Sequence, residues 1–302
     1  MKRLVIYLVV TFGLTWGTWI PAGIYTGAFA NGAGASPLMT VLVALGMFAP
    51  LVGALVTHFT STPTERIDLC YRPHIDGNVR CYLLAWFGPA VLALLGSVLF
   101  FLVQPQLFDP TMMTYMESVA ATAGIPADQV AAQPAPTPLL LAATVLSAVT
   151  AAPFINMVPA FGEELGWRGM LFPLLCKRMS QRAAVLVSGV IWGLWHAPII
   201  AMGHNYGMGY PGFPIAGILM MVLACIAMGS IMSYLRLRTG SVWPCALAHG
   251  AVNATASIGV LFCTAGFTLL GPNMLGLLAG LPMIAVGIVC WLRMPIADQG
   301  DA

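Results

Sequence analysis

The sequence predicts an all-α protein, a polytopic membrane bundle of about eight transmembrane helices. Hydrophobic residues make up 59% of the 302 positions and charged residues only 7%, and the mean hydropathy is +0.89. A soluble domain carries about a quarter charged residues. Residues 1–302 are therefore expected to form a single integral membrane domain.

Apolar runs of roughly 20 residues, long enough to cross a ~30 Å hydrocarbon core, recur along the whole chain. The predicted spans are 4–26, 37–60, 81–104, 138–160, 184–203, 213–235, 241–263 and 268–292. The first apolar run is longer than the 7–15 residues of a secretory signal, so an uncleaved helix is expected. The loop 105–137 is rich in proline and is expected to be irregular, with one short helix over 111–123.

The basic residues follow one membrane orientation. With both termini in the cytoplasm, every Lys and Arg except Arg168 lies on the cytoplasmic side. The long outer loop carries only the acids Asp109, Glu117 and Asp128. We predict a multi-pass protein of the cell (plasma) membrane whose surroundings are the lipid bilayer. The net charge of +2 is too small to predict a nucleic-acid partner.

The seven cysteines are scattered through mostly apolar segments. Their spacing fits neither a zinc nor a redox motif. They are therefore interpreted as small buried hydrophobic residues.

Two adjacent glutamates, Glu163 and Glu164, stand in a long non-polar stretch together with Arg168. Charges inside a membrane segment are costly and usually functional. Glu164 and Arg168 are four residues apart, so a helix places them on one face within reach of an ion pair. Glu163 is rotated by about 100° and points elsewhere.

Two further motifs combine polar residues on separate predicted spans. His196 follows Trp192 by four residues, and Asn253 follows His249 by four. At a rise of ~1.5 Å per residue, Glu163 lies roughly 20 Å from the cytoplasmic end of its helix, if that helix runs on to Cys176, and His196 and Asn253 lie roughly 18 Å deep. His249 lies roughly 12 Å deep. The four groups are expected to meet in one layer, within a motif-bearing core of about 138–263.

These motifs resemble those of the CPBP intramembrane metalloprotease family, which includes type II CAAX prenyl proteases and the Abi or bacteriocin-processing proteins. Glu163-Glu164-Leu-Gly-Trp-Arg168 resembles the EExxxR motif, and His249-Gly-Ala-Val-Asn253 resembles HxxxN. Trp192 replaces the phenylalanine of FxxxH before His196, which keeps an aromatic wall. The resemblance covers about 153–255.

The resemblance implies an intramembrane endopeptidase that cleaves a membrane-associated protein or peptide. Glu163, or less favourably Glu164, would act as general base on a water that His196 also holds. His249 and Asn253 would form an oxyanion hole. Glu164 would be held ionised by Arg168. No metal is expected to be obligatory; if Zn²⁺ is bound, the ligands are expected to be Glu163, His196 and His249.

Other interpretations stay open at the level of sequence. A transporter, or a non-enzymatic bacteriocin-immunity or scaffold protein on the same fold, could use the Glu and Arg side chains for proton or solute handling. Asn156 is interpreted as an interhelical hydrogen-bonding residue. His58, His74 and His204 are interpreted as non-catalytic.

Glycines spaced four apart stand on two motif helices. These are Gly162 with Gly166 and Gly189 with Gly193. Such spacing lets helices approach closely. Either the two faces bring Glu163 and His196 to one water, or they are general packing faces.

Overall fold

The computed structural model describes residues 1–122, 125, 129, 137–264 and 268–294. Within these ranges the chain is helical, and the only β-type pairing is an isolated bridge between Phe108 and Cys263. The predicted all-α class is therefore confirmed. Asp128 and parts of the loops at 105–137 and 264–267 lie outside the described residues.

The helices follow the apolar runs closely. Their bounds are α1 Lys2–Thr26, α2 Ala28–Asn31, α3 Pro37–Gly46, α4 Ala49–Phe59, α5 Val79–Val103, α6 Met113–Thr122, α8 Pro138–Thr150, α9 Ala152–Gly166, α10 Phe172–Cys176, α11 Gln181–Trp195, α12 Ala197–Ile200, α13 Ile215–Thr239, α14 Trp243–Thr255 and α15 Leu281–Leu292. A π-helical turn, η4 (Trp167–Leu171), joins α9 to α10, and a 3₁₀ turn, η5 (Ile258–Phe262), follows α14.

Among the described residues, six helical segments are long and apolar enough to cross a membrane. They are Lys2–Thr26, Pro37–Phe59, Val79–Val103, Pro138–Cys176, Ile215–Thr239 and Trp243–Phe262. The protein is thus a multi-pass membrane protein. The helices α11 and α15, in two other predicted spans, have 15 and 12 residues, and the count of eight stays a prediction.

The last predicted span, 268–292, is helical only from Leu281 onward, so its first half was predicted wrongly. Residues 268–280 form turns in which Leu277 N–H donates to the Leu269 carbonyl. Pro272 has no N–H to donate to a helix, and Gly271 adopts a φ of 144°. Apolar composition alone did not reveal these breaks.

The short helix α6 confirms most of the helix predicted over 111–123. Asp109 precedes it, and its carboxylate accepts hydrogen bonds from the backbone N–H groups of Thr111 and Thr114. Burial opposes ionisation of this carboxyl, but these hydrogen bonds outweigh it and lower the pKa of Asp109 to about 2. The chain from Asp109 to Thr114 is therefore held by an ionised side chain at neutral pH.

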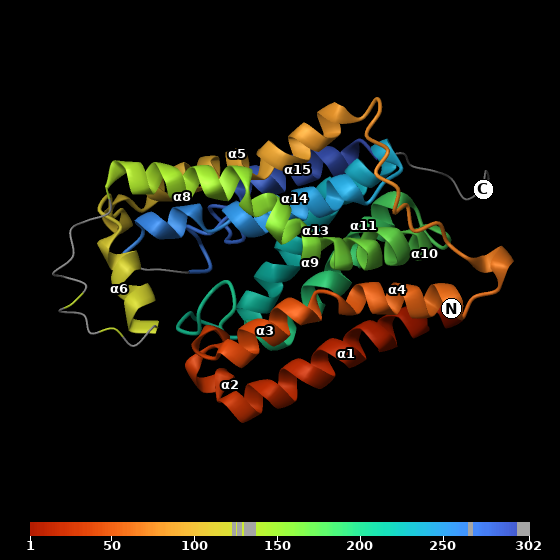
Figure 1. Cartoon of the computed structure of the whole chain (residues 1–302), viewed down its shortest axis with the longest axis horizontal. Helices are drawn as coiled ribbons and strands as arrows, with labels where there is room; N and C mark the ends of the chain where they lie inside the picture. Colours follow the sequence, from red (N-terminus) through yellow and green to blue (C-terminus); the bar gives the residue numbers. More distant parts are fainter. Residues whose placement is uncertain (123–124, 126–128, 130–136, 265–267, 295–302) are drawn as a thin grey trace.

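Two helical layers enclose α9. In Figure 1, α1, α3 and α4 form one layer, and α5, α8, α14 and α15 lie on the opposite side. The α9 helix packs against both α4 and α14, while α11 packs against α13. The glutamate pair near the end of α9 therefore lies between the layers, away from the lipid-facing surface.

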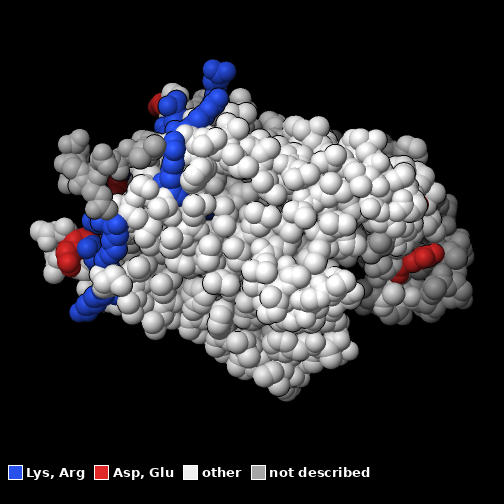
Figure 2. Space-filling view, turned by 180° about the vertical axis from the view of Figure 1, so that it is seen from behind, with Lys and Arg blue, Asp and Glu red and all other residues white. Residues whose placement is uncertain are grey.

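On the surface of the bundle, charged side chains gather at the two ends. Figure 2 shows Lys and Arg gathered at one end together with some acidic groups, an uncharged middle, and an acidic patch without Lys or Arg at the other end. This distribution agrees with the predicted orientation, although which side faces the cytoplasm stays a prediction. Arg168 is the basic residue that does not fit, and its side chain is fully enclosed, with 1% exposure.

The paired glycines are packing faces, and they face different helices. A Cβ on Gly162 or Gly166 would strike the chain around Phe48 and Pro50. A Cβ on Gly193 would strike Val222 of α13, and Gly189 likewise meets α13. The two faces do not meet each other, so the packing interpretation is confirmed. Whether these faces bring Glu163 and His196 to one water stays a prediction.

Candidate active site

Glu163 lies at the end of α9 and accepts two indole hydrogen bonds on one oxygen. Its Oε2 receives Trp167 Nε1–H at 3.0 Å and Trp192 Nε1–H at 2.8 Å. Trp167 is four residues further along the same helix, whereas Trp192 comes from α11. Oε1 has no hydrogen-bond partner among the described residues, so one oxygen is held and the other is available.

Glu164 forms the predicted ion pair with Arg168. Its Oε1 lies 3.0 Å from Arg168 Nη1 and also accepts a hydrogen bond from His249 Nδ1–H at 3.0 Å. The guanidinium lies over the Trp192 ring, 4.4 Å from its centroid. Both members of the pair are buried, so the attraction acts in a medium of low dielectric.

The end of α11 explains how His196 is oriented. His196 N–H donates to the Gly193 carbonyl, one residue short of the helical partner, so the Trp192 carbonyl is left free. His196 Nδ1 bonds to that carbonyl at 2.8 Å. A carbonyl only accepts, so Nδ1 carries the proton and Nε2 of the neutral ring carries a lone pair.

His249 is placed beside Glu164 by close packing of α14 on α9. A Cβ on Gly250 would collide with the backbone of Pro153 and Met157, so the glycine allows this approach. Because ionised Glu164 can only accept, His249 Nδ1 donates the hydrogen bond. Its Nε2 has no protein partner among the described residues. Asn253 lies one turn further along α14 and is exposed.

A single cavity of about 510 Å³ collects the predicted catalytic side chains. Its walls include Glu163, His196, His249 and Asn253. Glu164 and Arg168 do not line it. The two carboxylates are therefore divided as predicted: Glu163 faces the cavity, whereas Glu164 lies behind it with Arg168.

Sequence reasoning missed some cavity residues. Asn156 hydrogen-bonds the Ala152 carbonyl in its own helix, so its predicted interhelical role is wrong, and it lines the cavity. His204 also lines it, and burial lowers the pKa of His204 to about 4. Neither residue belongs to a motif. Trp167, by contrast, stands four residues after Glu163, and this helical spacing could have revealed it.

A metal centre is not pre-formed by these side chains. Within the part of the chain that the structure describes, no three His, Cys, Asp or Glu side chains gather closely enough to hold one ion. Glu163, His196 and His249 offer suitable donor chemistry but do not form such a group. The expectation that no metal is obligatory, with Zn²⁺ as the alternative, therefore stays a prediction, and no step below runs through a metal. All seven cysteines are free of disulfides.

The fold and cavity define a multi-pass helical membrane protein that gathers acid–base side chains inside its bundle. Residues 140–255 match the family described as type II CAAX prenyl endopeptidase, Rce1-like. The predicted resemblance to the CAAX protease family is thus confirmed for residues 140–255, which are similar to that family.

A curated relative agrees with this assignment. The chain is 34% identical over 85 residues to CAAX prenyl protease 2 of Methanococcus maripaludis. The match covers 28% of this chain and 31% of the relative. The chain thus spans less than a third of the length of that relative.

Proposed function

We propose that the chain is a membrane endopeptidase that hydrolyses a peptide bond with a water bound between Glu163 and His196. The observation that carries the proposal is the cavity in which Glu163, His196, His249 and Asn253 meet inside an apolar bundle. A transporter would use the carboxylates but has no need of the imidazole and amide groups at the same cavity.

The hydrogen-bond pattern suits a water with two acceptors. One O–H donates to Glu163 Oε1 and the other to His196 Nε2, since both atoms have free lone pairs. The water oxygen then attacks the substrate carbonyl carbon while Glu163 takes the proton. The new C–O bond forms as the carbonyl π electrons move to oxygen. Glu163 later returns the proton to the amine that leaves when the C–N bond breaks.

The developing oxyanion faces donors on α14. The Asn253 amide supplies N–H groups, and His249 supplies Nε2–H when both of its ring nitrogens carry protons. Glu164 and Arg168 act as positioning residues, because Glu164 holds His249 Nδ1 and Arg168 balances the carboxylate charge.

The substrate class is proposed from the family. The relative is called a CAAX prenyl protease, so a prenylated peptide ending in a CAAX sequence is the first candidate. A membrane-associated substrate suits a cavity inside a bundle of membrane helices. We place the protein in the plasma membrane, as its sequence predicts.

The proposal is tested by cleavage of a farnesylated CAAX peptide by the full chain in proteoliposomes. Wild type is expected to cleave it, and Glu163→Gln and His196→Ala are expected to lower kcat at least roughly 10²-fold, the usual size of an acid–base contribution. Glu117→Gln and His58→Ala are matched controls outside the cavity. Cleavage retained in both cavity variants, or absent in wild type, overturns the proposal.

A further inference from the structure

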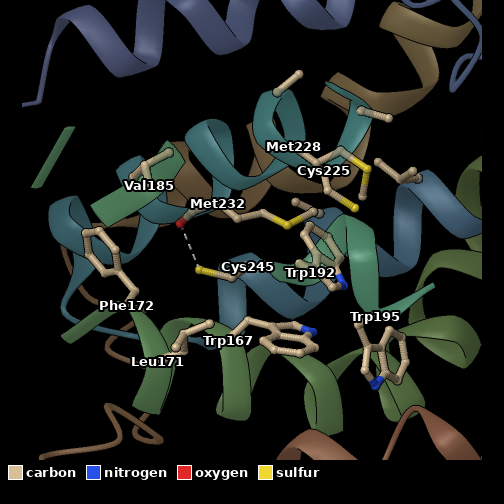
Figure 3. Close-up of a cluster of buried hydrophobic side chains, with 14 of the residues drawn as sticks. Trp167, Leu171, Phe172, Val185, Trp192, Trp195, Cys225, Met228, Met232 and Cys245 are labelled. Carbon is tan, nitrogen blue, oxygen red and sulfur yellow. Dashed lines mark hydrogen bonds between the residues drawn. The ribbon is translucent and has the colours of Figure 1, made fainter. Parts of the chain in front are cut away.

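The two indoles that contact Glu163 donate hydrogen bonds to only one of its carboxylate oxygens. Trp167 and Trp192 both donate to Oε2, and all three side chains are at most 2% exposed. In Figure 3 the indole nitrogens of Trp167 and Trp192 lie on the same side of the buried cluster, and that of Trp195 points away. Trp195 Nε1–H instead donates to Thr15 Oγ1 at 2.8 Å.

Hydrogen bonds to an ionised carboxylate are about twice as strong as hydrogen bonds between two neutral groups, and they fix the orientation of the carboxylate. Two donors on Oε2 occupy the lone pairs of that oxygen and lock the carboxylate plane. Only Oε1 is then left to accept a proton. A glutamate without these donors could present either oxygen and rotate between them.

Trp192 also holds the second partner of the proposed water. Its backbone carbonyl fixes His196 Nδ1 at 2.8 Å, and its indole fixes Glu163 at 2.8 Å. Phenylalanine, which the family motif has at this position, would keep the aromatic wall and the carbonyl but would lose the N–H donor. Tryptophan at position 192 therefore adds a hydrogen-bond donor to Glu163 that phenylalanine would lack.

We infer that Trp167 and Trp192 are positioning residues that clamp Glu163 Oε2 and reserve Oε1 for the attacking water. The clamp joins α11 to the end of α9, so it couples the orientation of Glu163 to that of His196. This inference rests on the proposed role of Glu163 as base and adds the residues that orient it.

The kinetic test uses phenylalanine, which removes the donor and keeps the ring. Trp192→Phe and Trp167→Phe are each expected to lower kcat for the farnesylated peptide roughly tenfold, with KM within about twofold, since one hydrogen bond to a charged group is lost. The acidic limb of the pH–rate profile should move to higher pH, because donors favour the ionised carboxylate. Trp86→Phe is the matched control, since Trp86 Nε1–H donates to the Val149 carbonyl.

A second measurement does not depend on activity. In ¹⁵N-tryptophan-labelled full-length protein in nanodiscs, the chain's eight tryptophans give indole N–H resonances that the single Phe variants assign. Glu163→Leu is expected to shift the Trp167 and Trp192 resonances upfield and to leave that of Trp86 in place.

The two readouts separate the two proposals. If wild type fails to cleave but both indole resonances respond to Glu163→Leu, the clamp stands and the proposed function fails. If neither resonance responds, or if Trp192→Phe keeps the wild-type kcat while the protease is active, the inference is overturned. Thermal unfolding of each variant distinguishes loss of the clamp from loss of the fold.

Discussion

Two cavities of about 510 Å³ each lie on either side of Met228 and Val252, which line both. The candidate catalytic cavity contains carboxylate, imidazole and amide groups. The other, here called the apolar groove, runs between α5, α13, α14 and α15, and among its lining residues only Tyr234 and Arg293 carry strongly polar groups. The two cavities have equal volumes but largely different lining residues. The candidate active site is therefore distinguished by its polar groups and not by its volume.

The two cavities also differ in the interactions that their buried side chains require. Beside the candidate catalytic cavity, each buried carboxylate has partners: Glu164 contacts Arg168 and His249, and Glu163 accepts hydrogen bonds from two indoles. The apolar groove needs no such network because its walls are hydrocarbon. The polar region should therefore be far more sensitive to single substitutions, and the following predictions test that difference.

The largest effect is expected from Arg168→Met. The change leaves Glu164 buried without its guanidinium, which typically costs about 3–5 kcal/mol of folding free energy. Arg3→Met is the matched control, because Arg3 pairs with Glu65 at 3.9 Å on the surface and such pairs contribute at most about 1 kcal/mol. Denaturant unfolding in micelles measures the free energy of unfolding of both variants. Equal losses would show that the buried ion pair contributes no more to stability than the surface pair.

A smaller loss, confined to catalysis, is expected from Asn253→Ala. Removal of one oxyanion-hole donor lowers kcat by about 10²–10³-fold. KM and thermal stability should change little, since Asn253 is exposed at the cavity. Asn78→Ala is the control, because that amide bonds the His74 carbonyl outside the cavity. An unchanged kcat in Asn253→Ala would exclude Asn253 from the proposed oxyanion hole.

The smallest effect is expected from Val286→Phe in the apolar groove. The chemical groups lie in the other cavity, so kcat should stay within about twofold of wild type, as for most surface changes. The same peptide cleavage assay measures it. A tenfold fall in kcat would mean that the apolar groove takes part in the reaction, and the contrast between the cavities would fail.

The Glu164–Arg168 pair shows what local spacing can predict. Four residues on a helix place two side chains on one face, and the ion pair is present at 3.0 Å. The apolar runs likewise predicted the membrane class and, to within a few residues, the bounds of α1, α5 and α13. Several other runs are divided into shorter helices, such as α3 and α4 within 37–60. The turn region 268–280 escaped prediction because its glycines and proline are few among apolar residues.

Contacts between helices were harder to predict. The spacing of Gly162 and Gly166 indicated a close approach but not that α4 was the partner. Nothing in the separation of Trp192 from Glu163 along the chain indicates a hydrogen bond between them. Asn156 and His204 line the cavity because segments distant in sequence pack together there, and neither residue belongs to a motif that would have predicted this.

The membrane class, the motif residues and the pairing of Glu164 with Arg168 follow from the sequence, because helical periodicity acts within a few residues. Three other relations are evident only in the folded protein: Trp167 and Trp192 share one oxygen of Glu163, His249 binds Glu164, and two adjacent cavities differ in chemistry. Those relations depend on how α9, α11 and α14 pack, and side-chain packing between distant segments has no fixed spacing in sequence.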